Sequence, residues 1–359
     1  MPLEALRHPI TPAGLHYLLI HYDIPFVDAG AWALDVEGAV AQPQRLTLDD
    51  LRAREAVEVA VTMECAGNGR ALFDPHVVSQ PWLRDAVGTA RWRGISMRSV
   101  LEEARVEDSA VEIVFTGLDR GIEGDVAQEY ARSLPLEEAM RDEVVLAYEM
   151  NSAPLLPQHG YPLRLVVPGW YGMTNVKWLS RVTVLAEPFA GYQQSRAYRM
   201  RAHEDDDGEA VQRMVPRSLL VPPGIPEFLT RARTLRAGIC VLEGRAWSGQ
   251  APIEHVEISV DGGATWEPAQ LAADDLGRWA WRGWTYEWEA RPGAHRVGSR
   301  ARDAVGNAQP LAATWNVGGY ANSAVQWVNV AVAEFGVTRE RARSGASRPR
   351  PARPSGSRA

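Results

Sequence analysis

Cysteine is scarce in this sequence, with only Cys65 and Cys240 among 359 residues. Two thiols are too few for a zinc site of four cysteines or a cysteine-bound iron–sulfur cluster, and they allow one disulfide at most. Long apolar runs are also missing, because no window reaches the ~18 unbroken apolar residues that a membrane helix needs. Any redox metal must therefore be bound by few protein thiolates, and no membrane span is expected.

Positive charge is in deficit, since the formal net charge is -7. A nucleic-acid-binding protein needs a basic face to neutralise phosphates, so we expect no nucleic-acid partner. The first residues, Met1 to Pro12, contain neither a twin arginine nor a basic segment followed by an apolar stretch, and so do not resemble an export signal. We expect a cytoplasmic protein, or a periplasmic one if the start of the gene has been misplaced.

Apolar residues are abundant, at 46% of a chain long enough for two domains. Between residues 32 and 185, short β-rich stretches alternate with helix-like stretches, which predicts a mixed α+β or α/β domain. Thr47 and Ser96 place hydroxyl groups where helix N-caps are needed. The predicted strands are Val57–Thr62, Val111–Phe115, Val144–Tyr148 and Leu163–Val167, and the predicted helices are Leu46–Arg54 and Ser96–Glu103.

The pattern changes after Ala186. The acidic run Glu204–Glu209 is interpreted as a solvated linker in preference to a cation site. Beyond it, short strands separated by turn-forming residues predict an antiparallel β-sandwich. The predicted strands are Ile239–Trp247, His255–Val260 and Ala294–Ala301, and we expect Cys240 to be an inert core residue. The stretch Thr338–Ala359 is rich in Arg, Ser and Pro, and is expected to be a disordered, solubilising tail.

The densest group of chemically capable residues is Val61–Arg70, where a strand-like run gives way to small residues. Gly67 and Gly69 permit positive φ and close backbone approach, so a ligand can come near the main chain beside Cys65. Arg70 would lower the pKa of the thiol and offers a planar fork to an oxyanion. From the residues alone two interpretations stay open, an inert buried cysteine and a reactive or metal-binding thiolate.

Glu64–Arg70 resembles the cysteine loop of sulfite oxidases and eukaryotic nitrate reductases, in which the thiolate binds molybdenum. Further stretches that resemble the same family, in the same order and spacing, are Leu146–Asn151, His159–Arg164, Val167–Gly169 and Val176–Leu179. Ser259–Trp266 and Trp315-Asn316 resemble the family's immunoglobulin-like dimerisation domain. The resemblance covers nearly the whole chain except its tail. It implies a molybdopterin-binding domain at 1–215, a dimerisation domain at 216–335 and a tail at 336–359.

The resemblance also implies a single molybdenum–molybdopterin cofactor, with Cys65 as the thiolate ligand. Soft thiolate ligation suits a metal that transfers oxo groups between oxidation states. Arg70 and Tyr198 match positions that contact substrate, with roles in anion recognition and hydrogen bonding. The residues that match contacts to the pterin or its phosphate are His21, Asp119, His159, Arg164, Asn175 and Lys177. Asn175 stands where animal members have serine, but it can still form hydrogen bonds.

Two features depart from the family. Leu19 stands where animal and plant sulfite oxidases have an arginine that holds sulfite, and Trp315–Tyr320 lacks the arginine of the corresponding family segment. Two missing charge-assisted hydrogen bonds would weaken anion binding by roughly 10²- to 10⁴-fold. Sulfite is therefore a candidate substrate beside a less anionic one. The alternatives are a non-catalytic molybdopterin-binding or assembly protein, and an S-oxide reductase of the same superfamily.

No haem-attachment motif, no dinucleotide-binding fingerprint and no cytochrome-type domain is found in the sequence. Electrons from an oxidised small-molecule substrate would therefore pass to a separate acceptor. A homodimer is implied by the resemblance alone.

Overall fold

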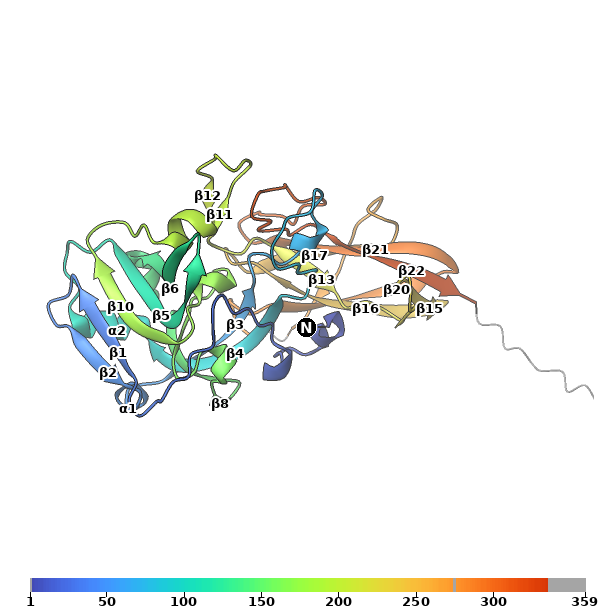
Figure 1. Ribbon diagram of the computed structural model, residues 1–359. Helices are drawn as coiled ribbons and strands as arrows, with labels where there is room; N and C mark the ends of the chain where they lie inside the picture. Colours follow the sequence, from blue (N-terminus) through green and yellow to red (C-terminus); the bar gives the residue numbers. More distant parts are fainter. Residues whose placement is uncertain (1, 274–275, 335–359) are drawn as a thin grey trace, which may run out of the picture.

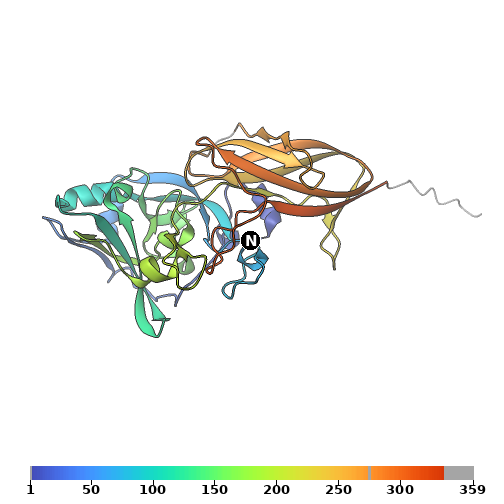
Figure 2. The same cartoon turned by 90° about the horizontal axis from the view of Figure 1, so that it is seen from above.

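The computed structural model describes residues 2–273 and 276–334, which form two β-rich parts arranged end to end in an elongated molecule (Figures 1 and 2). The first part contains two five-stranded sheets. One sheet has the order β2 (Gln44–Thr47), β1 (Ala33–Gly38), β10 (Leu179–Leu185), β5 (Glu112–Glu123) and β6 (Val126–Pro135). The other has the order β3 (Val57–Glu64), β4 (Val87–Ser96), β7 (Val145–Met150) and β8 (Ala153–Pro154), with β9 (Arg164–Val166) also paired to β7.

A single apolar core lies between these two sheets. Leu34 and Phe115 reach it from the first sheet, and Ile95 and Leu146 from the second, all fully buried. The period-two alternation that predicted the strands is what places these side chains on the inner faces. All four strands predicted in this part are confirmed, each overlapping an observed strand.

The helices of this part are short and lie at the ends of strands. They are α1 (Leu48–Arg52), α2 (Met97–Ala104) and α3 (Leu136–Ala139), with single turns at η1 (Leu3–Arg7), η2 (Ala13–Leu15), η3 (Arg70–Leu72), η4 (Pro157–His159), η5 (Gly172–Thr174) and the π-helical η6 (Gln193–Ala197). The Thr47 cap is confirmed, because Thr47 and Asp50 form a reciprocal capping box. The Ser96 cap is wrong in its chemistry, because that side chain makes no capping bond and its carbonyl accepts from the Ser99 hydroxyl instead.

The second part is a β-sandwich, as predicted, but it is not wholly antiparallel, because one pair of its strands is parallel. One sheet has the order β13 (Arg217–Leu220), β16 (Gly238–Trp247), β20 (Arg282–Ala290) and β19 (Gln270–Leu271). The other has the order β14 (Ile225–Pro226), β15 (Arg233–Arg236), β22 (Gln326–Ala333), β21 (Gly293–Asp303), β17 (Ile253–Ser259) and β18 (Glu267–Pro268). A second apolar core fills the space between them, with Leu242 and Val297 at its centre. Cys240 lies at the edge of this core and is only partly buried.

Two segments tie the parts together. The chain start lies between them in Figure 1, where fully buried Leu6 packs against the sandwich and its carbonyl accepts from Arg245 Nε at 2.8 Å. Near the end of the sandwich, the segment 316–322 returns to the first part, where Ala321 N–H donates to the Ala66 carbonyl at 2.8 Å. The cysteine loop is therefore held by residues from both parts of the chain.

The acidic run forms the exposed loop of a small hairpin, in which β11 (Arg199–Met200) pairs with β12 (Glu209–Ala210). Within residues 2–273 and 276–334, no group of three or more His, Cys, Asp or Glu side chains is placed to hold a metal ion. The expected disordered tail lies outside the described residues.

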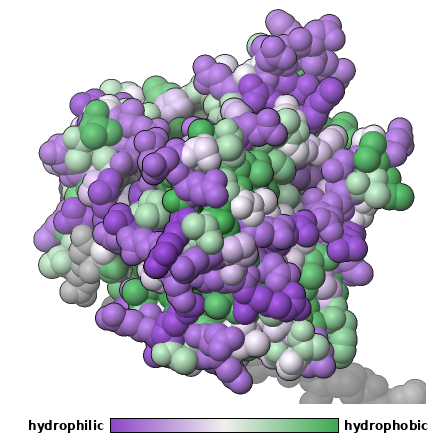
Figure 3. All heavy atoms as spheres, turned by 90° about the vertical axis from the view of Figure 1, so that its left-hand side faces the viewer, coloured by the Kyte–Doolittle hydropathy of each residue, from purple (hydrophilic) through white to green (hydrophobic). Residues whose placement is uncertain are grey.

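Hydrophilic residues dominate the face in Figure 3, with apolar residues interspersed among them. In the part of the chain that the structure describes, every helix is too short or too polar to cross a membrane.

Candidate active site

A cavity with an empty volume of about 620 Å³ lies in the first part, next to the end of β3. Its wall comes from segments far apart in the sequence, including the chain start, the cysteine loop, β5, η4, β9 and η5. All but one of the predicted site residues line it: Cys65, Tyr198, His21, Asp119, His159, Arg164, Asn175 and Lys177. The fold thus brings together side chains that the sequence only suggested belong to one site.

Cys65 follows directly after β3, where the pairing with β4 ends. Its N–H donates to the Ala86 carbonyl at 2.9 Å, and its own carbonyl accepts from Asn68 N–H at 2.9 Å, closing a tight turn. Gly69 adopts φ +94°, and a Cβ there would lie 2.9 Å from the Asn322 carbonyl oxygen. The glycine is therefore needed both for the turn and for the approach of the returning segment.

The Cys65 thiol is buried, and burial raises its pKa to about 11, against weaker opposing effects of the Gly67 backbone and Arg70. On its own it is a protonated, unreactive thiol. A bound metal cation would displace the proton, since a coordinating thiol is deprotonated outright.

Arg164 is a buried cation whose contacts are all neutral. Its Nη1 donates to the His159 carbonyl at 3.0 Å and its Nη2 to the Asn175 carbonyl at 3.1 Å, while Nε has no partner. Its guanidinium carbon lies 4.7 Å from the centre of the Trp92 ring. Burial lowers the pKa of Arg164 to about 10, which still leaves it charged at neutral pH.

Lys177 is the second cation of the cavity, and it also faces carbonyl oxygens. Its Nζ donates to Leu19 at 2.8 Å and to Gln158 at 3.3 Å. Burial lowers the pKa of Lys177 to about 7, with nearby Arg164 acting in the same direction. Trp178 beside it has φ +49°, a strained conformation for a bulky residue, and is held by full burial and a 2.8 Å bond from Nε1 to the Pro157 carbonyl. An anionic ligand would raise the pKa of Lys177 and stabilise both cations.

The histidines of the cavity are neutral. Burial lowers the pKa of His21 to about 3 and that of His159 to about 4. A 2.5 Å hydrogen bond joins His21 Nε2 to the Tyr198 hydroxyl. Asp119 behaves in the opposite way, because burial raises its pKa to about 7, and its Oδ1 has no hydrogen-bond partner. Neutral rings and a protonatable carboxyl can each form hydrogen bonds with a heterocycle.

Asn175 lines the cavity but uses its side chain on the backbone. Its Oδ1 accepts from Val167 N–H at 2.7 Å, and its Nδ2 donates to the Tyr171 carbonyl at 3.2 Å. It therefore shapes the turn that carries Lys177.

Arg70 is the one predicted site residue that does not line the cavity. Its Nε donates to the Gly318 carbonyl at 2.9 Å, its Nη1 contacts the Ser79 hydroxyl and the Gln80 carbonyl, and its guanidinium carbon lies 5.1 Å from the centre of the Tyr320 ring. It is buried without an acidic partner among the described residues. Its role in anion recognition stays a prediction.

Sequence reasoning missed several residues of the wall. His16, Tyr17 and Tyr130 all line the cavity, and burial lowers the pKa of His16 to about 3. His16 and Tyr17 come from the irregular chain start, and Tyr130 is one aromatic in an ordinary strand. None carries a local motif, so only the folded chain could have identified them.

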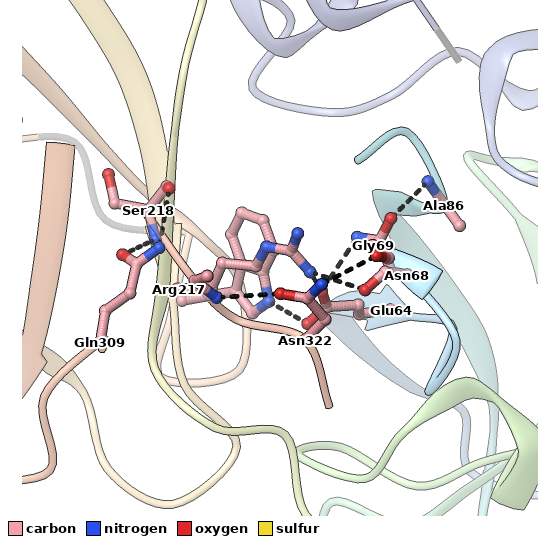
Figure 4. A network of polar contacts seen from close by, with 10 residues as sticks. Glu64, Asn68, Gly69, Ala86, Arg217, Ser218, Gln309 and Asn322 are labelled. Carbon is pink, nitrogen blue, oxygen red and sulfur yellow. Dashed lines mark hydrogen bonds and ion pairs between the residues drawn. The ribbon is translucent and has the colours of Figure 1, made fainter. Parts of the chain in front are cut away.

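Glu64, the neighbour of Cys65, belongs to a separate polar network that Figure 4 shows. Its carboxylate accepts from Arg217 Nη1, from Asn68 Nδ2 at 2.9 Å and from Trp247 Nε1 at 2.9 Å. Both charged side chains of the pair are only 2% exposed. Because Arg217 is on β13, this network fastens the cysteine loop to the sandwich.

Known proteins and family models match this chain along most of its length. The family model described as "Oxidoreductase molybdopterin binding domain" matches residues 21–193, and the one described as "Mo-co oxidoreductase dimerisation domain" matches residues 209–334. Rat mitochondrial sulfite oxidase is 35% identical over 341 residues, covering 90% of this chain and 62% of the rat protein. NADH nitrate reductase 1 of rice is 33% identical, covering 92% of this chain and 39% of the rice protein.

Among solved structures, the sulfane dehydrogenase SoxCD of Paracoccus pantotrophus matches with a TM-score of 0.78 and 27% identity, over 91% of this chain and 82% of that one. The fold, the thiol-lined cavity and these matches define a molybdopterin-binding oxidoreductase domain followed by a dimerisation domain. The chain belongs to the sulfite oxidase family of molybdopterin oxidoreductases.

Family membership implies a molybdenum–molybdopterin cofactor, and the cavity fits such a group. It joins a thiol to two basic side chains, Arg164 and Lys177, which form no direct ion pair with a carboxylate among the described residues. It also contains three buried polar atoms without partners, Arg164 Nε, Asp119 Oδ1 and His16 Nε2. Buried polar groups are normally satisfied, so their concentration here indicates a polar, anionic ligand.

Proposed function

We propose that this protein is a molybdenum-cofactor enzyme that carries out two-electron oxo transfer on a sulfur compound, with sulfite as the candidate substrate. The observation that supports this most strongly is that Cys65, Arg164 and Lys177 line one cavity. The rat relative is a sulfite oxidase and the structural neighbour a sulfane dehydrogenase, so both names point to sulfur chemistry.

The bound cofactor would supply a molybdenum centre able to accept two electrons and transfer an oxygen atom. Cys65 would be its protein ligand and would lose its thiol proton on binding. Arg164 and Lys177 would neutralise the pterin phosphate, since charge-assisted hydrogen bonds to phosphate are strong ones. His21, His159, Asp119 and Asn175 would bind or shape the space for the pterin.

Tyr198 would contact the substrate. It lines the cavity, and its hydroxyl is hydrogen-bonded to neutral His21. Desolvation raises the pKa of Tyr198, so it stays protonated and can donate a hydrogen bond to an oxygen of the substrate. Arg70, the other proposed substrate contact, lies beside Tyr320, whose ring is next to that of Tyr198.

The electrons would leave to a separate protein or small-molecule acceptor, and the molecule would be a homodimer through its second part. The match of residues 209–334 to a dimerisation domain supports the homodimer. We place the boundaries at 1–215 for the molybdopterin-binding domain and 216–335 for the dimerisation domain. The chain start and the segment 316–322 each cross from one part to the other, so each domain is held in part by contacts with the other domain.

A kinetic comparison of the wild type with Cys65→Ser tests the proposal. Both proteins are produced in a host that makes molybdopterin, and sulfite-dependent reduction of an artificial one-electron acceptor is followed. We expect turnover in the wild type and none in Cys65→Ser, with unchanged circular dichroism. Cys240→Ser is the matched control and should retain full activity. Sulfite turnover in Cys65→Ser at the wild-type rate would overturn the assignment of the ligand.

A further inference from the structure

Arg132 is a buried cation that the proposed function does not yet use. It lies on β6, two residues after Tyr130, so both side chains point to the same face of the strand, and Tyr130 lines the cavity. Arg132 is only 1% exposed. Within residues 2–273 and 276–334, no carboxylate forms an ion pair with it.

The contacts that Arg132 does make are to neutral groups. Its Nη1 donates to the Gln193 carbonyl, in the π-helical turn η6 that directly precedes Tyr198. Its guanidinium carbon lies 5.5 Å from the centre of the Tyr198 ring, and its Nε has no hydrogen-bond partner. A buried cation with unused donors and no counter-ion is costly, so this arrangement needs a reason.

Tyr198 and Tyr320 together form a wall between two spaces. Tyr198 lines the cavity that holds Cys65, and Tyr320 lines a larger open groove with an empty volume of about 1660 Å³. Their ring centres lie 5.3 Å apart with an angle of 32° between the planes. A small molecule that passes from the groove to Cys65 through this wall meets both tyrosines.

Each ring of the wall has an arginine beside it. The guanidinium carbon of Arg132 lies 5.5 Å from the centre of the Tyr198 ring, and that of Arg70 lies 5.1 Å from the centre of the Tyr320 ring. Two guanidinium groups that form no ion pair with a carboxylate among the described residues thus lie beside the two rings. Guanidinium forks match the geometry of oxyanions and stay charged when buried.

We propose that Arg132 is a specificity-determining residue that binds the anionic oxygens of the substrate at the Tyr198–Tyr320 wall. The substrate class is a small sulfur oxyanion such as sulfite. Arg132 then supplies positive charge that Leu19 and the segment 315–320 cannot provide. This inference rests on the proposed function, because it concerns the substrate of that same site.

The test uses Arg132→Gln in the cofactor-loaded full chain, because glutamine is neutral but can still donate to the Gln193 carbonyl. We expect KM for sulfite to rise about 10- to 100-fold, as for the loss of one charge-assisted hydrogen bond, with kcat changed much less. Sulfate, which cannot be oxidised further, is the second probe. Its dissociation constant, measured by calorimetry, should rise by the same factor. Arg132→Lys keeps the charge but not the guanidinium fork. Its KM for sulfite and its sulfate dissociation constant should lie between those of the wild type and those of Arg132→Gln.

Arg233→Gln is the control for loss of a buried arginine away from the cavity, since Arg233 is buried in the sandwich and donates to the Pro222 and Pro223 carbonyls, although it also pairs with Glu4. It should change neither KM nor sulfate binding. An unchanged KM and unchanged sulfate affinity in a folded, molybdenum-loaded Arg132→Gln would overturn the inference and leave the proposed function intact. If Arg132→Gln does not fold, an unchanged KM and unchanged sulfate affinity in Arg132→Lys would overturn the inference. Arg132-dependent sulfate binding without sulfite turnover in the wild type would instead support the inference and reject sulfite as the substrate.

Discussion

Glu64 and Cys65 are neighbours in the chain, yet they belong to two kinds of buried polar surroundings. Glu64 is met by Arg217, Asn68 and Trp247, so its charge has an opposite charge and hydrogen bonds (Figure 4). The side of the loop that carries Cys65 faces Arg164 and Lys177, whose hydrogen bonds go to neutral groups, mainly backbone carbonyls. Satisfied buried charge is used to hold a structure together, whereas unsatisfied buried charge is kept for a ligand.

The difference has a direct consequence for mutagenesis. Removing one member of the Glu64 network leaves a buried charge without its partner and should cost stability. Removing a cation from the cavity relieves a desolvation cost in the empty protein and should weaken only ligand binding. The two regions are therefore expected to respond in opposite ways to the loss of an arginine.

The largest expected effect is on cofactor retention. Arg164→Met together with Lys177→Met should lower the affinity for the pterin by about 10²- to 10⁴-fold, because two charge-assisted hydrogen bonds to its phosphate are lost. The free energy of unfolding of the empty protein should fall little or even rise. Pterin released by denaturation and measured by fluorescence gives the occupancy, and urea unfolding gives the stability. Wild-type occupancy in the double variant would remove both residues from the cofactor site.

The next effect is on stability. Arg217→Met should lower the free energy of unfolding by about 3–5 kcal/mol, because Glu64 then stays buried and charged without its partner. Arg7→Met is the matched control, since the Arg7–Glu243 pair is roughly half-exposed and should contribute less than about 1 kcal/mol. Equal losses in the two variants would show that the Glu64 network is not the fastening between the parts.

The smallest expected effect is a decrease in the free energy of unfolding at acid pH. Burial lowers the pKa of His16 to about 3 from its usual 6.5, so its neutral form stabilises the fold above pH 6.5, and that contribution is lost as the pH falls. Between pH 7 and pH 5 the loss from His16 alone should be about 2 kcal/mol in the empty protein, and His21 and His159, whose pKa values are also lowered by burial, act in the same direction. Asp119 acts in the opposite sense, since its pKa is raised to about 7.

His16→Gln isolates the contribution of His16 from those of the other titrating groups. Its decrease in unfolding free energy between pH 7 and pH 5 should be about 2 kcal/mol smaller than that of the wild type, measured by urea unfolding at both values. His255→Gln, an exposed change in the sandwich, should follow the wild type. Identical pH dependence in His16→Gln and the wild type would mean that His16 is not held neutral by burial.

Much of the fold could be predicted from the sequence, because the strands of both parts show regular apolar alternation and the turns between them are rich in glycine and aspartate. Thr47 was a reliable cap since Asp50 lies three residues later and completes a capping box. Ser96 lacks such a partner, and its hydroxyl makes no capping bond. Local patterns therefore predicted local structure where two residues reinforced each other.

The residues of the site also fall into two groups, those that local patterns predicted and those that only the folded chain shows. Cys65, His159, Arg164 and Lys177 lie in stretches that resemble a known family, so their presence at one cavity could be expected. The Glu64–Arg217 pair joins residues 153 positions apart, and nothing in either neighbourhood indicates the other. Arg132 was missed because an arginine in an alternating strand is usually on the exposed face, and only the packing of η6 and Tyr198 shows that it is buried.

The most direct test of the whole account is the molybdenum content per chain, determined by elemental analysis of protein made in a host that synthesises molybdopterin. Cys65→Ser is purified alongside as the matched sample. We expect about one molybdenum per wild-type chain and a clear loss of metal in Cys65→Ser. Folded wild-type protein that contains no molybdenum would contradict the account, because the cavity's unpaired cations and buried thiol would then have another purpose.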